Sequence, residues 1–144
     1  MENQEMKYDV TDYLLNNLDI TTATAEVYVG DRFIQVGKPF LIRAMTPDEF
    51  EVWQKQCNKT KFVKGKRESE FNNKRFNELV AISCTIQPNF KDAETLKKAG
   101  CSTPEQFLYK ALLAGEIMHL AGEISALSGF DKTLDEIKEE VKND

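Results

Sequence analysis

The sequence lacks long apolar runs, paired cysteines and an apolar leader. Its uninterrupted apolar stretches, such as residues 111–114, are far shorter than the ~20 residues of a transmembrane helix, so we expect no membrane span. The first five residues are polar and acidic, whereas a secretory signal begins basic and turns apolar, so we do not expect export. No CxxC pair occurs, which predicts reduced thiols rather than disulfides or a zinc site at Cys57, Cys84 and Cys101.

Residues suited to catalysis are also scarce. The only histidine, His119, shares a helical face with Glu123, and the two could supply two metal ligands. No third ligand stands at a suitable spacing, which favours a surface histidine with acidic neighbours. The chain has neither a glycine-rich phosphate loop nor a nucleophile elbow. We therefore expect a protein that is not an enzyme and that holds no metal or cofactor.

Charge is unevenly distributed along the chain. The 144 residues are 41% hydrophobic and 30% charged, which predicts one globular domain over residues 1–144. The net charge is −5, and both residues 1–22 and residues 133–144 are acidic. Residues 59–67 instead contain five basic residues and no acid.

This basic run predicts a mobile linker over residues 58–70, either a loop or a loose hairpin. Three roles stay open for it: a solvated loop, a docking segment for an acidic protein, and a nucleic-acid arm. The acidity of the whole chain favours a protein partner, so we do not expect nucleic-acid binding. The candidate contact residues are Lys61, Lys64, Lys66 and Arg67.

The pattern of apolar residues predicts an α+β, mainly helical fold, with an N-terminal β-hairpin over 25–45 packed against a C-terminal helical bundle. Residues 1–24 form an N-terminal segment with a short helix over 9–17. Residues 26–29, 32–36 and 40–45 have strand composition, and we expect residues 30–31 to form a bulge in one long strand rather than a turn. Residues 46–130 form the helical core, with helices over 46–56, 72–86, 92–100, 103–112 and 115–128. An acidic helix follows over 131–144.

Helical and strand spacing also predicts which side chains are buried. The expected core contains Phe33, Ile42, Phe50, Trp53, Phe76, Leu79, Val80, Phe107, Leu120 and Ile124. Apolar side chains left over would form a binding surface for a protein partner, although each of them could instead pack inside. The candidates are Tyr109, Leu113, Ile117 and Met118, and, on the hairpin, Val27, Val29 and Phe33.

Several different short motifs follow one another in a definite order along residues 9–131. They are Asp12 to Leu15, Arg32-Phe33, Gly37-Lys38-Pro39, Ile42-Arg43, Leu79 to Ala81, Pro88-Asn89, Leu112-Leu113, Gly115-Glu116 and Gly129-Phe130-Asp131. In order and spacing this series resembles the XkdN-like tail assembly chaperones of contractile-tailed phages and PBSX-like defective prophages. Ala114 departs from the pattern, since many members have proline there.

The resemblance implies a function that the chemistry of single residues does not. Such chaperones are not enzymes; they bind the tape measure protein, and tail tube subunits as a further partner, during tail assembly in the cytoplasm of the bacterial host. They are absent from the finished particle, and a homo-oligomer is compatible with this role. Two alternatives remain: a structural tail or head–tail connector protein that stays in the particle, and a small protein–protein adaptor.

Overall fold

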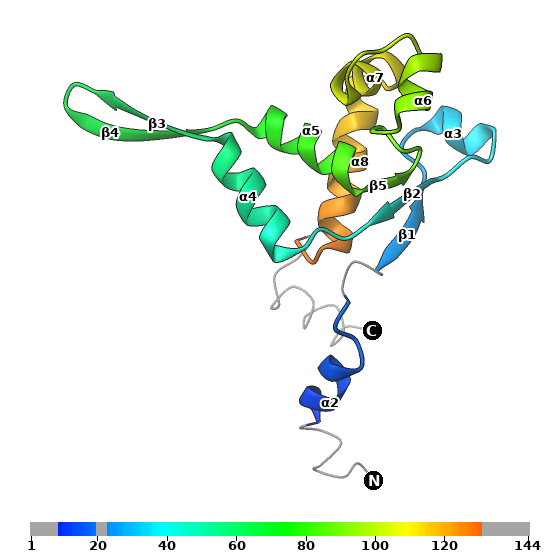
Figure 1. The fold of residues 1–144 in the computed structure, drawn as a ribbon, viewed down its shortest axis with the longest axis horizontal. Helices are drawn as coiled ribbons and strands as arrows, with labels where there is room; N and C mark the ends of the chain where they lie inside the picture. Colours follow the sequence, from blue (N-terminus) through cyan, green and yellow to red (C-terminus); the bar gives the residue numbers. More distant parts are fainter. Residues whose placement is uncertain (1–8, 20–22, 131–144) are drawn as a thin grey trace.

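The structure is a computed structural model that describes residues 9–19 and 23–130 (Figure 1). The acidic helix expected over 131–144, and with it Asp131, lies outside the described residues. In chain order the elements are α2 (Val10–Leu15), β1 (Thr24–Val27), α3 (Asp31–Gln35), β2 (Phe40–Arg43), α4 (Pro47–Cys57), β3 (Asn58–Val63), β4 (Lys66–Phe71), α5 (Asn73–Cys84), β5 (Thr85–Gln87), α6 (Ala93–Lys98), α7 (Pro104–Ala111) and α8 (Ala114–Leu127). The fold is α+β and mainly helical, as the sequence predicts.

A three-stranded antiparallel sheet in the order β1-β2-β5 lies against α8. β1 and β2 pair from Thr24↔Arg43 to Val27↔Phe40, which confirms the pairing expected within residues 25–45. The connection between them is different: residues 32–36 do not form a strand, residues 30–31 do not form a bulge, and helix α3 occupies the connection. Residues 32–36 have the composition of a strand, but they form a helix because the helix lets the Phe33 ring pack edge-on against the Phe40 ring. The two ring centroids are 5.0 Å apart.

Local capping signals are confirmed at the starts of the helices. Thr46 and Glu49 form the capping box of α4, and the side chains of Asp92 and Thr103 cap α6 and α7. The expected end of α5 is wrong, because the helix stops at Cys84 and the next three residues form β5. The Thr85 hydroxyl donates a hydrogen bond to the Ala81 carbonyl (2.7 Å), and the extended backbone then pairs with β2 instead of continuing the helix.

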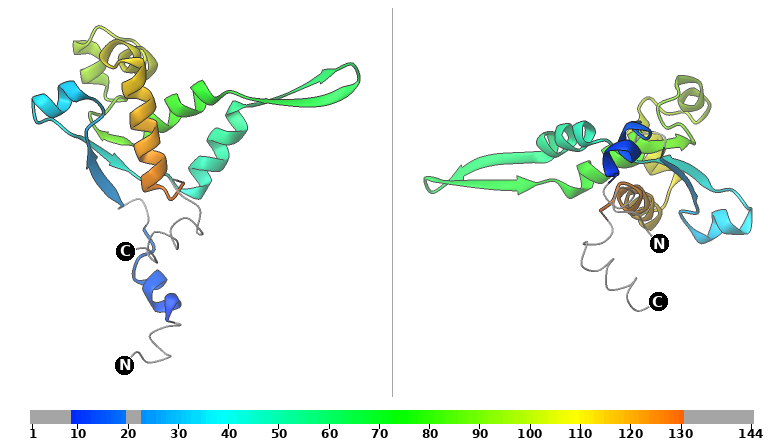
Figure 2. Two further views of the ribbon diagram at one scale, coloured as in Figure 1. Left: turned by 180° about the vertical axis from the view of Figure 1, so that it is seen from behind. Right: turned by 90° about the horizontal axis from the view of Figure 1, so that it is seen from below.

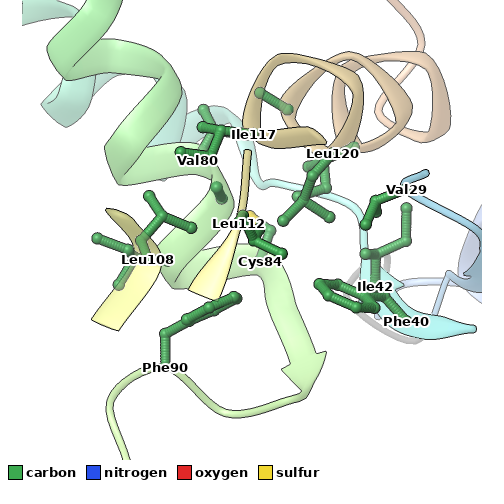
Figure 3. Close-up of a cluster of buried hydrophobic side chains, with 14 of the residues drawn as sticks. Val29, Phe40, Ile42, Val80, Cys84, Phe90, Leu108, Leu112, Ile117 and Leu120 are labelled. Atoms are coloured by element: carbon green, nitrogen blue, oxygen red, sulfur yellow. The ribbon is translucent and has the colours of Figure 1, made fainter. Parts of the chain in front are cut away.

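The hydrophobic core lies between the sheet and helices α5, α7 and α8, and Figure 3 shows its side chains converging from these elements. Five of the predicted core residues are buried: Ile42, Trp53, Val80, Leu120 and Ile124. The other five pack against the core but are only partly buried: Phe33, Phe50, Phe76, Leu79 and Phe107. The prediction missed several of the most buried side chains, among them Phe90 and Leu108, each at 0% exposure.

Residues 58–71 form an arm, the β3–β4 hairpin, that projects from the ends of α4 and α5 (Figures 1 and 2). Regular pairing from Asn58↔Phe71 to Val63↔Lys66 replaces the open linker that the sequence also allowed. Lys64 and Gly65 both have positive φ (54° and 79°), as a two-residue type I′ turn requires. All residues of both strands are exposed.

Candidate functional site

An apolar groove of about 340 Å³ lies where α5, α7 and α8 meet. Its lining residues are Asn73, Lys74, Asn77, Glu78, Tyr109, Ala114, Ile117 and Met118. Tyr109 and Met118 are accessible, with exposed fractions of 47% and 67%. The exposed side of α7 and the first turns of α8 therefore leave apolar surface uncovered beside α5.

A hydrogen-bond network holds Tyr109 in the wall of the groove. Its hydroxyl donates to Glu78 Oε1 (2.7 Å), and Arg75 Nη1 lies 3.3 Å from both Glu78 Oε2 and Glu105 Oε1. Burial, followed by the hydrogen bond to Glu78, raises the pKa of the Tyr109 phenol to about 12. Tyr109 is therefore a neutral side chain in a fixed orientation. The Lys74 Nζ lies 5.4 Å from the centre of the Tyr109 ring and adds a positive charge at the rim of the groove.

Two residues of the sequence motifs, Arg32 and Glu116, meet across 84 positions of the chain. Arg32 Nε and Nη2 donate to the two carboxylate oxygens of Glu116 (2.8 and 2.7 Å), and Nη2 also donates to the Ala111 carbonyl (2.6 Å). The hydrogen bond from Arg32 lowers the pKa of the Glu116 carboxyl, and the Leu113 backbone N–H contributes to the same effect. The ion pair thus fixes α3 to the first turn of α8.

Gly30 leaves room for the carboxylate of Glu116. A Cβ at this position would lie 2.5 Å from Glu116 Oε2, closer than van der Waals contact allows. The φ of Gly30 is −173°, an extended value open to any residue, so a larger side chain here would act by displacing the Glu116 carboxylate and not by straining the backbone.

A second hollow of about 580 Å³ lies between α3 and the start of α8, next to this ion pair. Leu113, 66% exposed, lines the hollow together with Ile34, Gly115 and His119. Leu113 is therefore accessible, but it lies on the rim of this second hollow and not in the apolar groove.

Three of the sequence candidates line the groove, but one of these three is buried, and so is one candidate on the hairpin. Tyr109, Ile117 and Met118 line it, but Ile117 is only 7% exposed and belongs to the core, so its expected surface position is wrong. Val29, at 2% exposure, is likewise a core residue, because it packs under α8 instead of facing outward. Val27 and Phe33 are partly buried against the core.

The basic candidates lie on the arm, which projects away from the helices (Figure 1), and none of them lines the groove. Lys61 Nζ is 3.3 Å from Glu70 Oε2, so part of its charge is offset by an acid that follows the basic run. Lys64 lies in the turn, and Lys66 and Arg67 begin β4, so the free end of the arm carries three positive charges.

The remaining motif residues serve the fold. Gly37 and Gly129 have φ of 66° and 94°, which favour glycine at the turns after α3 and α8. Lys38 donates its backbone N–H to the Phe33 carbonyl (3.0 Å) before Pro39 leads into β2. The Phe130 ring packs 5.0 Å from that of Phe50.

Side chains suited to catalysis or metal binding do not cluster in the described part of the chain. His119 Nε2 lies 3.6 Å from Glu123 Oε1, on an exposed face of α8. Within residues 9–19 and 23–130 no cluster of three or more metal-ligating side chains occurs, and no helix there is long and apolar enough to cross a membrane. Burial raises the pKa of the Cys84 thiol to about 11, which makes it a poor nucleophile.

The model of the phage XkdN-like tail assembly chaperone family matches residues 11–142. The chain belongs to this family. It is 27% identical to the protein YqbN of Bacillus subtilis (strain 168) over 147 residues, which span 99% of this chain and 98% of YqbN. It is 25% identical over 147 residues to protein XkdN of the phage-like element PBSX from the same strain, with 99% of both chains covered.

The crystal structure of YqbN has the same fold as this XkdN-like chaperone. The two superpose with a TM-score of 0.57 at 24% identity, over 74% of this chain and 85% of YqbN.

Sequence reasoning missed the α5 side of the groove. Glu78 precedes the apolar pair Leu79-Val80 and follows Arg75 by three residues, a spacing typical of a solvated helix face. Its partner Tyr109 is 31 residues away, and no periodic signal links the two.

Proposed function

We propose that this chaperone binds the tape measure protein through the apolar groove during tail assembly in the host cytoplasm, and leaves before the particle is complete. The observation that carries the proposal is the accessible apolar surface of Tyr109 and Met118 beside α5, in a member of a tail assembly chaperone family. Tail tube subunits are a further expected partner.

The chemistry of the groove suits an amphipathic helical segment. A helix binds such a groove through apolar side chains at i, i+3 or i+4, and i+7. Met118 can repack against different side chains because its thioether is flexible and polarisable, whereas Tyr109 is held by Glu78 and gives a fixed wall. One rigid and one adaptable contact would let a single groove accept successive segments of a long client.

The arm supplies a separate, electrostatic contact. The charges of Lys64, Lys66 and Arg67 stand at its free end, and Lys61 lies next to them on β3. Exposed charges of this kind mainly raise the association rate with an acidic partner and are screened by salt. We expect the arm to speed the encounter with an acidic client and the groove to determine how long it stays bound.

Co-purification with the tape measure protein tests the groove. Met118→Asp should weaken binding by about tenfold or more, because client binding would bury an unpaired carboxylate. The matched control is Val52→Asp, which places the same charge on an exposed apolar position of α4 (50% exposed). Both variants should keep the thermal stability of the unsubstituted protein. Equal binding by both variants would disprove the groove as the client site.

Mass spectrometry of purified particles tests departure from the particle. A chaperone that leaves should be absent, while the tape measure and tube proteins are present. Stoichiometric retention of this chain would instead identify it as a structural tail or connector protein.

A further inference from the structure

Helix α2 has an apolar surface that the rest of the described chain leaves uncovered. No residue of this six-residue helix is buried. Its apolar side chains are 53–65% exposed, and that of Leu18, just beyond it, is 73% exposed. Figures 1 and 2 show α2 standing apart from the body of the molecule. Isolated helices this short are marginal in water, so α2 needs a surface to pack on.

The sequence of α2 presents an apolar stripe and a negative charge. Val10 and Leu14 stand at i and i+4 on one face of α2, and Leu18 follows three residues after the end of the helix. Residues 9–18 include the acids Asp9 and Asp12 and no basic residue. This segment is therefore a short amphipathic ligand with an acidic first turn.

The groove between α5, α7 and α8 is complementary to this segment. Its accessible apolar side chains are Tyr109 and Met118, and Lys74 adds a positive charge at the rim. Among the described residues, Glu78 is the one carboxylate that lines the groove, and it already accepts hydrogen bonds from Tyr109 and Arg75. An acidic apolar helix would thus meet apolar surface and an ammonium group.

We infer that α2 of one copy occupies the groove of a second copy. In Figure 1, α2 leads into β1 beside the last turns of α8, whereas the groove is at the first turns of α8, next to α7. Ligand and groove therefore lie at opposite ends of the body, which favours contact between copies. Such a head-to-tail contact leaves one free α2 and one free groove in each dimer, so it propagates into longer assemblies or closes into a ring.

A mixing experiment with full-length variants tests this arrangement. Leu14→Asp removes the apolar ligand, and Met118→Asp removes the groove; both side chains are exposed, so both variants should fold. Sedimentation velocity should show concentration-dependent association of the unsubstituted protein, and each variant alone should associate about tenfold or more weakly. An equimolar mixture of the two should form a 1:1 heterodimer and nothing larger, because one intact α2 meets one intact groove.

The control Val52→Asp should associate like the unsubstituted protein. A monomeric unsubstituted protein, or a mixture in which the two variants do not pair, would overturn the inference. The inference rests on the groove of the proposed function but requires no client. If the tape measure protein fails to bind while the mixture pairs, the proposed function fails and the self-association stands.

Discussion

The body and the arm of this protein are built on different principles. In the body, side chains such as Val80 and Leu120 have no exposed surface, and α5 and α8 are held in place by what they bury. In the arm, all residues of both strands are exposed, including Phe62 at 76%, and backbone pairing and a two-residue turn define the structure, together with the exposed ion pair Lys61–Glu70. Body positions are therefore constrained by packing, whereas the exposed positions of the arm are not.

The largest effect should come from the body. Leu120→Ala should lower the free energy of unfolding by about 2–5 kcal/mol, because it leaves a cavity at a fully buried site. Chemical denaturation of this variant and of Met118→Ala provides the comparison on one helix. Met118 is 67% exposed, so its truncation should change stability by no more than about 0.5 kcal/mol. Similar losses in both variants would mean that α8 packs through a different face.

A smaller effect should come from the ion pair that joins α3 to α8. The pKa of Glu116 is below its usual value of 4.5 in the folded protein, so the pair contributes stability above that pH and loses it as the pH falls below it. Glu116→Gln should lower Tm at neutral pH by a few degrees and flatten the loss of stability on acidification. Thermal melts between neutral and acidic pH measure this.

Glu51→Gln is the control for this measurement. Glu51 is an exposed carboxylate of α4 that pairs with Lys55 on the same helix (3.0 Å). It should melt like the unsubstituted protein at every pH. An unchanged acid profile in Glu116→Gln would show that the pair with Arg32 adds nothing to stability.

The smallest effect on folding should come from the arm. Replacement of Lys61, Lys64, Lys66 and Arg67 by serine should change stability by less than about 1 kcal/mol, because the ion pair to Glu70 is exposed. The same variant should associate more slowly with an acidic client, with a flatter salt dependence. A large drop in Tm would show that the arm is part of the folding unit. Tight binding of the unsubstituted protein to DNA at physiological salt would favour a nucleic-acid role for the arm.

Features set by neighbouring residues could be predicted from the sequence. The caps at Thr46, Asp92 and Thr103 are examples, because each depends on three or four consecutive residues. α3 and β5 were missed because tertiary contacts decide them: Phe33 reaches Phe40 from a helix, and residues after Cys84 pair with β2.

In the candidate site, too, some residues could be predicted from local spacing and others depend on tertiary contacts. Helical spacing found Tyr109 and Met118, but Ile117 and Met118 are adjacent, and one residue turns the side chain by about 100° around the helix. Only the packed structure shows that Ile117 faces the core and Met118 the groove. The contribution of Glu78 depends on a contact between α5 and α7 that no short pattern encodes.

The chain leaves the body for the arm and returns to it at a single point. The Asn72 backbone N–H donates to the Cys57 carbonyl (2.8 Å), which closes the base of the hairpin between the end of α4 and the start of α5. The relative position of α4 and α5 therefore does not depend on the length of the hairpin that lies outward of this hydrogen bond. Insertion of two residues in each strand would move the turn outward by about 7 Å without reversing the two faces of the ribbon. The length of the arm is therefore adjustable by insertion or deletion alone, with the helical packing left as it is.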